Sequence, residues 1–350
     1  MQLDETKLMA FVHEAVGDVG AVLNGAMVVL GDQLGLYRAL AGAGPLTPTE
    51  LAARTGTAER YVREWCLAQT ARGYLTYEGG GRFRLPDEHA VALTDETSPA
   101  CVIGAFETAL GAVYATDQVA ERFRTADGLA WGDQDGHVHT GCERFFRPGY
   151  LTNLTSTWIP ALDGVEESLT RGARVADVGC GHGATALILA EAYPASQITG
   201  FDGHEGSIEA ARKRAADAGV GNRVTLEVGR ADAFPGRYDL VTMFDCLHDM
   251  GDPVGVARHV REALAPGGTW LLVEPQAGDT WEDNFNPVGA AYYGFSTLLC
   301  TPSSLSQPGG AALGAQAGEA RLTEVAKEAG FSQVRRVADT PFNLVLELKP

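Results

Sequence analysis

The sequence lacks the features that mark a secreted or membrane-embedded protein. Its six cysteines, among 350 residues, are scattered and include no C-x-x-C pair, so we expect free thiols rather than a disulfide framework. The chain opens Met-Gln-Leu-Asp-Glu, with no basic start followed by an apolar run, and it contains no stretch of about eighteen consecutive apolar residues. We therefore expect a cytoplasmic protein without a membrane partner.

Positive charge is also scarce. Lys and Arg number 27 against 45 Asp and Glu, which gives a formal net charge of −18. A negative field of this size repels phosphate backbones and anionic membranes. The charge therefore disfavours nucleic acid as a partner and favours neutral or cationic small molecules as substrates. The length leaves room for two or three domains with a sizeable core.

The most informative stretch is the glycine-rich segment at 174–185. An apolar run predicts a buried strand over 173–178, three glycines follow at Gly179, Gly181 and Gly183, and a helix is predicted from 184 to 193. Strand, glycine turn and helix N-terminus are typical of a nucleotide-binding crevice. A dinucleotide spacing, G-x-G-x-x-G/A, is formally met and a plain structural loop is also compatible. Asp177 just before the turn favours instead a ligand that carries an ammonium and a sulfonium.

Two further acids follow the next two predicted strands. Asp202 lies at the carboxyl end of a predicted strand at 197–201, roughly twenty residues after the turn, where a carboxylate can accept ribose hydroxyls. Asp232 follows a strand at 223–228, where it can accept an adenine amino group while Phe234 packs on the ring. Each acid alone could be an ordinary exposed aspartate. Three at successive strand ends favour a single adenosyl ligand.

These motifs resemble those of class I S-adenosylmethionine-dependent methyltransferases. The resemblance also covers Phe244–Met250 (FDCLHDM), Ala265–Gly268 (APGG) and Leu271–Pro275 (LLVEP). It is greatest to the subgroup with a winged-helix domain in front of the catalytic domain, many of which are small-molecule O-methyltransferases. The resemblance implies S-adenosyl-L-methionine as cofactor, S-adenosyl-L-homocysteine as product, and cofactor contacts from Asp177, Gly179, Cys180, Gly181, Gly183, Asp202, Gly203, Asp232, Ala233, Phe234, Phe244 and Asp245.

The front of the chain has the pattern of a winged helix. Residues 4–40 read as helical, and residues 45–95 predict two helices, a turn and a hairpin. One interpretation is DNA binding through the arginines at 60, 63, 72, 82 and 84. The other is dimerisation and substrate enclosure, which Glu59, Glu64 and the acidity of the chain favour. The resembled subgroup forms homodimers through this region, so we expect a homodimer here.

The sequence from residue 166 onward predicts an α/β, Rossmann-like domain. Strands at 173–178, 197–201, 223–228, 238–244 and 269–274 alternate with helices at 184–193, 204–218, 253–265 and 319–330. Two strands at 332–338 and 342–348 are separated by only a short turn, which demands an antiparallel last strand. The predicted domains are 1–95 (helical and winged-helix, dimerising), 96–165 (helical linker and active-site cover) and 166–350 (catalytic).

The predicted catalytic residue is His248, at the carboxyl end of the fourth strand. Methyl transfer to a hydroxyl requires alignment and removal of its proton, and an imidazole with an ordinary pKa near 6.5 can accept that proton. The resembled subgroup takes its general base from the matching histidine of its L-H-D motif. Asp249 or Glu274 could orient the ring. A histidine that only caps the strand is the alternative.

Several motifs that would indicate other chemistry are missing. No (Asp/Asn/Ser)-Pro-Pro-(Tyr/Phe) follows the fourth strand, which disfavours amino-group methylation of nucleobases, and no Asp/Asn cluster has the spacing of a metal-dependent catechol site, so we expect no metal. Residues 276–318 are too long for a simple connection and predict a substrate-pocket wall with a flap. Their aromatic residues indicate a flat apolar substrate. N- or C-methylation, a non-methylating enzyme and a ligand-sensing transcription regulator stay open as alternatives.

Overall fold

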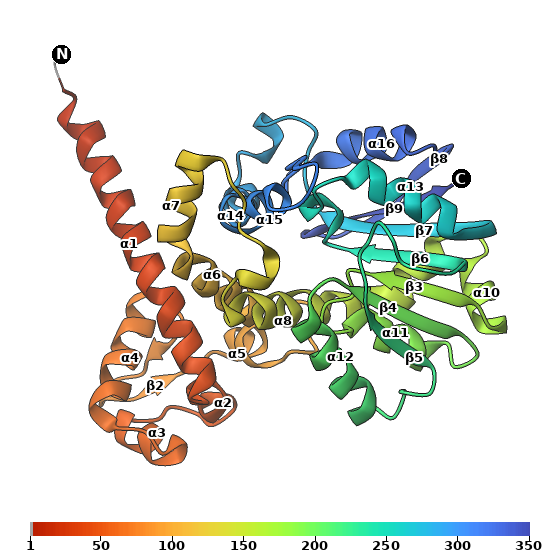
Figure 1. Ribbon diagram of the computed structural model, residues 1–350. Helices are drawn as coiled ribbons and strands as arrows, with labels where there is room; N and C mark the ends of the chain where they lie inside the picture. The colour runs from red at the N-terminus through yellow and green to blue at the C-terminus, as the bar shows by residue number, and fades with distance from the viewer. Residues whose placement is uncertain (1–2) are drawn as a thin grey trace. The chain divides into compact units, whose positions relative to one another are not determined.

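The computed structural model describes residues 3–350 (Figure 1). The chain divides into two compact units, of which the first holds the residues up to Leu110 together with Thr140–Pro148. The second unit holds Gly111–His139 and Gly149–Pro350. This division differs from domain boundaries at 95 and 165, because helices α6 (Ile103–Tyr114) and α8 (Gly136–Asn153) each contribute residues to both units.

The first unit contains the winged helix that the sequence predicts. Thr47 begins α3 with a capping box, in which its hydroxyl accepts from Glu50 N while the Glu50 carboxylate accepts from Thr47 N. Gly56 ends this helix with φ of +65°, a conformation that favours glycine. The elements are α1 (Glu5–Gln33), α2 (Leu36–Leu40), α3 (Pro48–Thr55), α4 (Glu59–Ala71), β1 (Thr76–Tyr77), β2 (Phe83–Arg84) and α5 (Asp87–Thr94).

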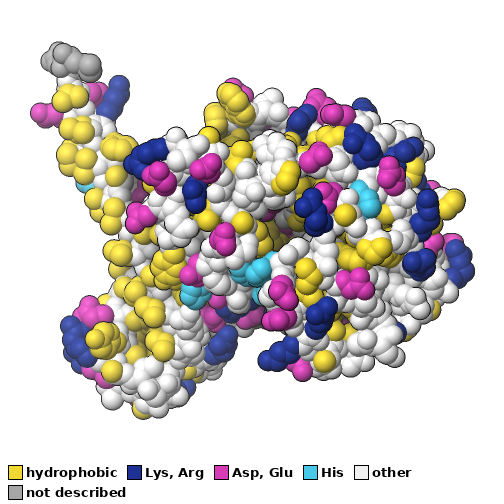
Figure 2. Space-filling view, in the orientation of Figure 1, with side chains coloured by type: hydrophobic (Ala, Val, Ile, Leu, Met, Phe, Trp, Pro, Cys, Tyr) yellow, Lys and Arg dark blue, Asp and Glu magenta, His cyan; other side chains and the backbone are white. Residues whose placement is uncertain are grey.

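The long helix α1 is apolar on much of its exposed surface. Only its carboxyl-terminal part is buried, where the Gln69 amide of α4 donates to Asn24 at 2.8 Å and accepts from the Tyr37 hydroxyl at 2.5 Å. Figure 2 shows apolar side chains gathered along the rest of the helix. In length and composition α1 could cross a membrane, with a mean hydropathy of 1.3 over its most apolar eighteen residues, 22% of which are buried.

A seven-stranded sheet forms the centre of the second unit. Its order is β5-β4-β3-β6-β7-β9-β8, in which β5 to β7 are parallel and β9 runs antiparallel to both neighbours. The predicted antiparallel last strand is therefore confirmed, and it inserts between β7 and β8. The strands are β3 (Arg174–Val178), β4 (Gln197–Asp202), β5 (Val224–Val228), β6 (Tyr238–Phe244), β7 (Leu264–Pro275), β8 (Gln333–Asp339) and β9 (Asn343–Lys349).

Helices cover both faces of this sheet (Figure 1). On one face, α13 and α16 pack on β6, β7 and β9 through a buried cluster that includes Val260, Trp270 and Leu346. The opposite face carries α10, α11 and α12. These helices are α10 (Val165–Arg171), α11 (Ala184–Ala192), α12 (Glu205–Asp217), α13 (Pro253–Ala263) and α16 (Gly318–Glu328). Burial on both faces explains why the central strands are continuously apolar.

Two mainly helical segments complete the second unit. The first contains α7 (Thr116–Thr125), the 3₁₀ turn η1 (Trp131–Asp133), the π-helical turn η2 (Leu154–Trp158) and α9 (Ile159–Ala161). The second is the predicted insertion, which folds as η4 (Glu282–Asn284), α14 (Pro287–Phe295), the π-helical turn η5 (Ser296–Cys300) and α15 (Thr301–Leu305). They touch each other, because Leu129 N donates to Pro302 O at 2.9 Å.

Candidate active site

The glycine turn after β3 is held tightly against two neighbouring strands. Gly179 has φ of +73°, and a Cβ there would lie 2.6 Å from Cys246 Sγ, so no side chain fits. Gly179 N and Cys180 N both donate to Phe201 O of β4, at 2.8 and 3.1 Å. Gly183 then precedes the first turn of α11. The turn thus brings a bare backbone and a helix N-terminus to the carboxyl edge of the sheet.

Asp177 lies beneath this turn rather than at its surface. Its side chain is fully buried and accepts from the hydroxyls of Thr185 at 2.6 Å and Thr242 at 2.8 Å. Burial raises the pKa of Asp177 to about 6, although both hydroxyls oppose the shift. Since both carboxylate oxygens are used within the protein, Asp177 fixes the turn to α11 and β6.

Asp202 lies at the end of β4 and also supports the turn. Its Oδ2 accepts from Gly181 N at 2.9 Å, and its Oδ1 accepts from His204 N at 2.8 Å. The carboxylate remains partly exposed, so it has lone pairs left for a ligand. Next to it, Gly203 is exposed and a Cβ there would meet open space.

After β5, Asp232 is exposed, whereas Phe234 is buried. Asp232 is exposed and forms two short hydrogen bonds with Arg230, at 2.8 and 2.5 Å, which lower its pKa. Ala233 is exposed as well. Phe234 is only 2% exposed and packs against Phe201 and His259, so its ring belongs to the core. Asp232 and Ala233 are therefore the accessible residues at this strand end, whereas Phe234 supports them from below.

Asp245 follows β6 in a conformation that is uncommon for a residue with a side chain. Its φ is +50°, and its carboxylate accepts from Tyr150 Oη of α8 and Asn343 Nδ2 of β9, both at 2.7 Å. Burial raises the pKa of Asp245 to about 8, against the effect of the Tyr150 hydrogen bond. The Tyr150 ring also packs 5.1 Å from Phe244. Strained backbone of this kind concentrates at functional sites.

His248 is held by two carboxylates in the 3₁₀ turn η3 (Leu247–Asp249). Its Nδ1 lies 2.5 Å from Glu274 Oε2, and Glu274 Oε1 accepts from Leu247 N at 2.8 Å. Its Nε2 lies 3.2 Å from Asp249 Oδ1. Burial lowers the pKa of His248, but Asp249 and Glu274 outweigh this effect and raise the pKa well above 6.5. A carboxylate on Nδ1 fixes the tautomer and leaves Nε2 to exchange a proton.

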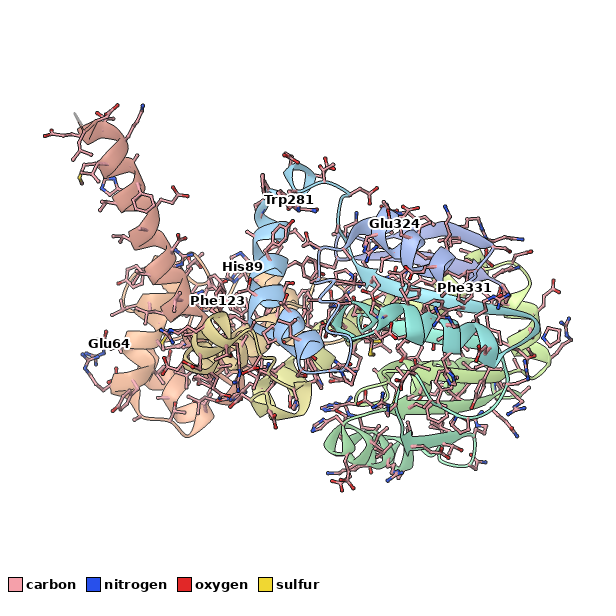
Figure 3. All side chains as sticks on the ribbon, turned by 45° about the horizontal axis from the view of Figure 1, so that its top comes forward. Glu64, His89, Phe123, Trp281, Glu324 and Phe331 are labelled. Atoms are coloured by element: carbon pink, nitrogen blue, oxygen red, sulfur yellow. The ribbon has the colours of Figure 1, made fainter. Side chains whose placement is uncertain are left out.

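The insertion packs directly on the loop that holds His248. Gln307 Nε2 donates to Asp249 O at 2.8 Å, Gln307 Oε1 accepts from Gly251 N, and Ser304 Oγ donates to Met250 O. The insertion therefore contacts the L-H-D loop through α15 and the residues that follow it. Two of the aromatic residues of the insertion are exposed, Trp281 at 77% and Phe285 at 73%. Figure 3 labels Trp281.

Comparison with known proteins bears on the identity of this site. A family model described as "Methyltransferase domain" matches residues 176–270, and one described as "Rv2258c-like winged HTH domain" matches residues 22–95. The solved structure of mitomycin 7-O-methyltransferase matches 99% of this chain and 100% of its own chain, at a TM-score of 0.70 and 20% identity. Residues 176–270 therefore match a methyltransferase domain, and the chain has the class I methyltransferase fold. Its resemblance to the winged-helix-fronted subgroup, predicted from sequence, is confirmed.

Part of the chain is also similar in sequence to named methyltransferases. Ubiquinone biosynthesis O-methyltransferase of Bordetella parapertussis is 36% identical over 156 residues, which are 43% of this chain and 61% of that protein. The 27-O-demethylrifamycin SV methyltransferase of Amycolatopsis mediterranei is 36% identical over 156 residues, 42% and 55% of the two chains. The chain therefore spans less than two thirds of the length of either relative.

A solved O-methyltransferase from neocarzinostatin biosynthesis has a comparable fold. It contains S-adenosylmethionine and 2-hydroxy-5-methyl naphthoic acid, and covers 93% of this chain and 95% of its own at a TM-score of 0.58 and 20% identity. In this chain, sequence patterns indicate the turn, the strand-end acids and the L-H-D loop. They missed the partners that fix these groups, namely Thr185, Thr242, Asn343 and Gln307, because those residues carry no local motif.

Proposed function

We propose that this methyltransferase transfers the methyl group of S-adenosylmethionine to an oxygen of a small, flat molecule, with His248 as the proton acceptor. The observation that carries the proposal is the Glu274–His248 contact beside the glycine turn. An in-line displacement on a sulfonium needs an aligned nucleophile and a base for its proton. Glu274 Oε2 lies 2.5 Å from His248 Nδ1 and accepts the proton on that nitrogen. This leaves Nε2 as the atom that accepts the substrate proton.

The cofactor contacts we propose divide into exposed and supporting groups. Asp202 would accept the ribose hydroxyls, and Asp232 with Ala233 would lie at the adenine, since these residues are accessible at the ends of β4 and β5. The bare glycine turn would face the methionine part. Asp177, Cys180, Phe234 and Asp245 would shape the site from beneath or beside it, because their side chains pack within the protein.

The test is product analysis. The protein, S-adenosylmethionine and a panel of phenols and hydroxynaphthoic acids are incubated, and products are read by mass spectrometry. We expect a gain of about fourteen mass units, one CH₂ formed by covalent group transfer, together with S-adenosylhomocysteine. His248→Ala should keep cofactor affinity and lower turnover about 10²–10⁴-fold. A fully active variant would assign His248 a packing role only.

The charge pattern of the winged helix argues against the regulator alternative. Arg60 pairs with Glu64 at 2.5 Å and Arg63 with Glu59 at 2.7 Å on α4, and Arg82 of the hairpin pairs with Glu50 at 2.9 Å. Arginines neutralised by neighbouring acids contribute little to phosphate binding. A gel-shift assay should show no tight, salt-dependent and sequence-selective DNA binding.

We also propose that the exposed face of α1 binds a second copy of this chain. Exposed apolar side chains follow one another along this helix, and contiguous exposed apolar patches mark interaction sites. His13, Glu14 and Asp18 interrupt the apolar stretch, which disfavours a lipid environment. The patch comprises Leu8, Met9, Phe11, Val12, Val16, Val19, Val22, Leu23 and Leu30.

Light scattering after gel filtration tests this dimer. We expect twice the chain mass, and a monomer for the double variant Val19→Asp, Val22→Asp. Lys213→Asp on the exposed face of α12 serves as the control and should stay dimeric. A wild-type monomer that floats with liposomes would assign α1 to a membrane instead.

A further inference from the structure

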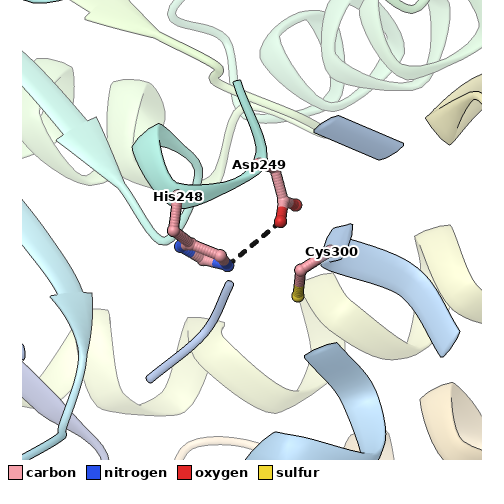
Figure 4. A group of neighbouring side chains, drawn as sticks. All are labelled: His248, Asp249 and Cys300. Atoms are coloured by element: carbon pink, nitrogen blue, oxygen red, sulfur yellow. Dashed lines mark ion pairs between the residues drawn. The ribbon is translucent and has the colours of Figure 1, made fainter. Parts of the chain in front are cut away.

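Cys300 is a buried thiol that the proposed methyl transfer does not use. It ends the π-helical turn η5 of the insertion, and irregular turns of this kind often occur at functional sites. Figure 4 shows it beside His248 and Asp249, which come from the loop after β6. One nitrogen, one carboxylate oxygen and the sulfur of these three residues all lie within 4.8 Å of one another.

The contact between His248 and Asp249 is close but is not a hydrogen bond. Asp249 Oδ1 lies 3.2 Å from His248 Nε2, yet within residues 3–350 no donor makes a well-aligned hydrogen bond to this buried oxygen. Buried polar atoms without a partner are rare and require an explanation. Two ligands of one tetrahedral zinc ion, each about 2.0–2.2 Å from the metal, lie about 3.3 Å apart and point at the ion rather than at each other.

The far side of the imidazole has the support that metal-binding histidines usually have. Glu274 Oε2 lies 2.5 Å from His248 Nδ1, while its second oxygen is fixed by Leu247 N. A carboxylate behind a histidine orients the ring and makes its other nitrogen a better ligand. Nε2 is therefore directed by the protein toward Asp249.

We propose that His248 Nε2, Asp249 Oδ1 and Cys300 Sγ form a zinc site, whose fourth position is left to water or a substrate oxygen. Nitrogen and sulfur ligands favour Zn²⁺ and Co²⁺ over Mg²⁺. On binding, the thiol of Cys300 gives up its proton to solvent as the sulfur–metal bond forms. The bound ion occupies the nitrogen that would accept the substrate proton, so zinc inhibits methyl transfer; this consequence, unlike the binding, rests on the proposed function.

A nucleophilic or redox-sensing role for Cys300 is disfavoured by its surroundings. Burial raises the pKa of the Cys300 thiol to about 12, so it is protonated at neutral pH and a poor nucleophile. A bound metal ion, in contrast, deprotonates a coordinating thiol outright.

Cobalt substitution provides the test on the intact protein. Metal-free protein titrated with Co²⁺ should develop a thiolate-to-cobalt charge-transfer absorption that Zn²⁺ abolishes and Mg²⁺ does not. Cys300→Ala should remove this absorption, and Cys142→Ala, on a partly buried cysteine of α8, should retain it. Asp249→Asn should weaken zinc binding about 10–100-fold or more. Unchanged melting temperatures of the metal-free variants exclude misfolding.

The outcomes separate the metal site from the proposed function. A wild-type spectrum without the thiolate band, or a band that survives in Cys300→Ala, overturns the zinc site and leaves the methyltransferase proposal standing. Zinc that binds through Cys300 without inhibiting supports the site and contradicts the assignment of His248 as base. Inhibition by zinc that Cys300→Ala relieves supports both.

Discussion

Replacing Glu274 by glutamine should inactivate the enzyme by reversing the histidine tautomer. The carboxylate accepts from two buried donors, Leu247 N at 2.8 Å and His248 Nδ1 at 2.5 Å. A glutamine has only one oxygen, and its amide nitrogen donates. If the oxygen serves Leu247, the NH₂ group faces Nδ1, the proton moves to Nε2, and His248 can no longer accept a proton from the substrate.

The magnitude follows from these two contacts. The opposite orientation of the glutamine sets two N–H groups against each other, and a buried unsatisfied donor costs about 1–3 kcal/mol. The first orientation is therefore favoured, and we expect turnover to fall about 10²–10⁴-fold. Raising the pH should not restore it, since the neutral tautomer is the inactive one. S-adenosylmethionine affinity should change little, because Glu274 is 1% exposed.

The assay is S-adenosylhomocysteine formation at saturating substrate, with calorimetry for the cofactor. Glu282→Gln, on an exposed glutamate of η4, is the matched control and should retain full activity. A tautomer reversal should lower turnover far more than about threefold. If the turnover of Glu274→Gln stays within about threefold of the wild-type value, the orienting role of Glu274 is refuted.

Three further predictions concern His248, Asp202 and Asp245. Turnover should rise with pH through a pKa above 6.5, because Asp249 and Glu274 stabilise the protonated imidazole of His248. A rise with an apparent pKa below 6.5 would contradict the assignment of His248 as the base. Asp202→Ala should weaken S-adenosylmethionine binding by about 1–3 kcal/mol in calorimetry, and unchanged affinity would remove the ribose assignment. Asp245 has a folded-state pKa raised from 3.8 to about 8, so its stabilising contribution is present at low pH and lost as the pH rises to about 8. Urea unfolding should therefore show Asp245→Asn becoming more stable relative to the wild type between pH 5 and pH 8, by up to about 1.4 kcal/mol per pH unit.

The positions of strands and turns were predictable because the spacing of apolar residues and the local composition indicate them. The predicted strands at 238–244 and 197–201 correspond to β6 and β4 within one residue at each end. The order of the last strands was only partly predictable: a short turn dictates an antiparallel pair, but the insertion of β9 between β7 and β8 depends on packing across the whole sheet.

Side-chain roles at the site were less predictable, because they depend on partners distant in sequence. Asp177 was expected at the ligand, yet Thr185 and Thr242 enclose it. Neither threonine stands out in the sequence. The approach of Cys300 to His248 joins residues 52 positions apart through an irregular helical turn, which no periodic pattern indicates.

The discontinuous division of the chain has a practical consequence for dissecting it. The backbone passes between the two compact units after Leu110, after His139 and after Pro148. A fragment starting at residue 166 would therefore lack Gly111–His139 and with it the buried side chains of Val119 and Leu129. It would also lose Tyr150, one of the two donors to Asp245. Severing the protein at a single peptide bond cannot yield an intact catalytic half, and interdomain grafts should exchange both segments together.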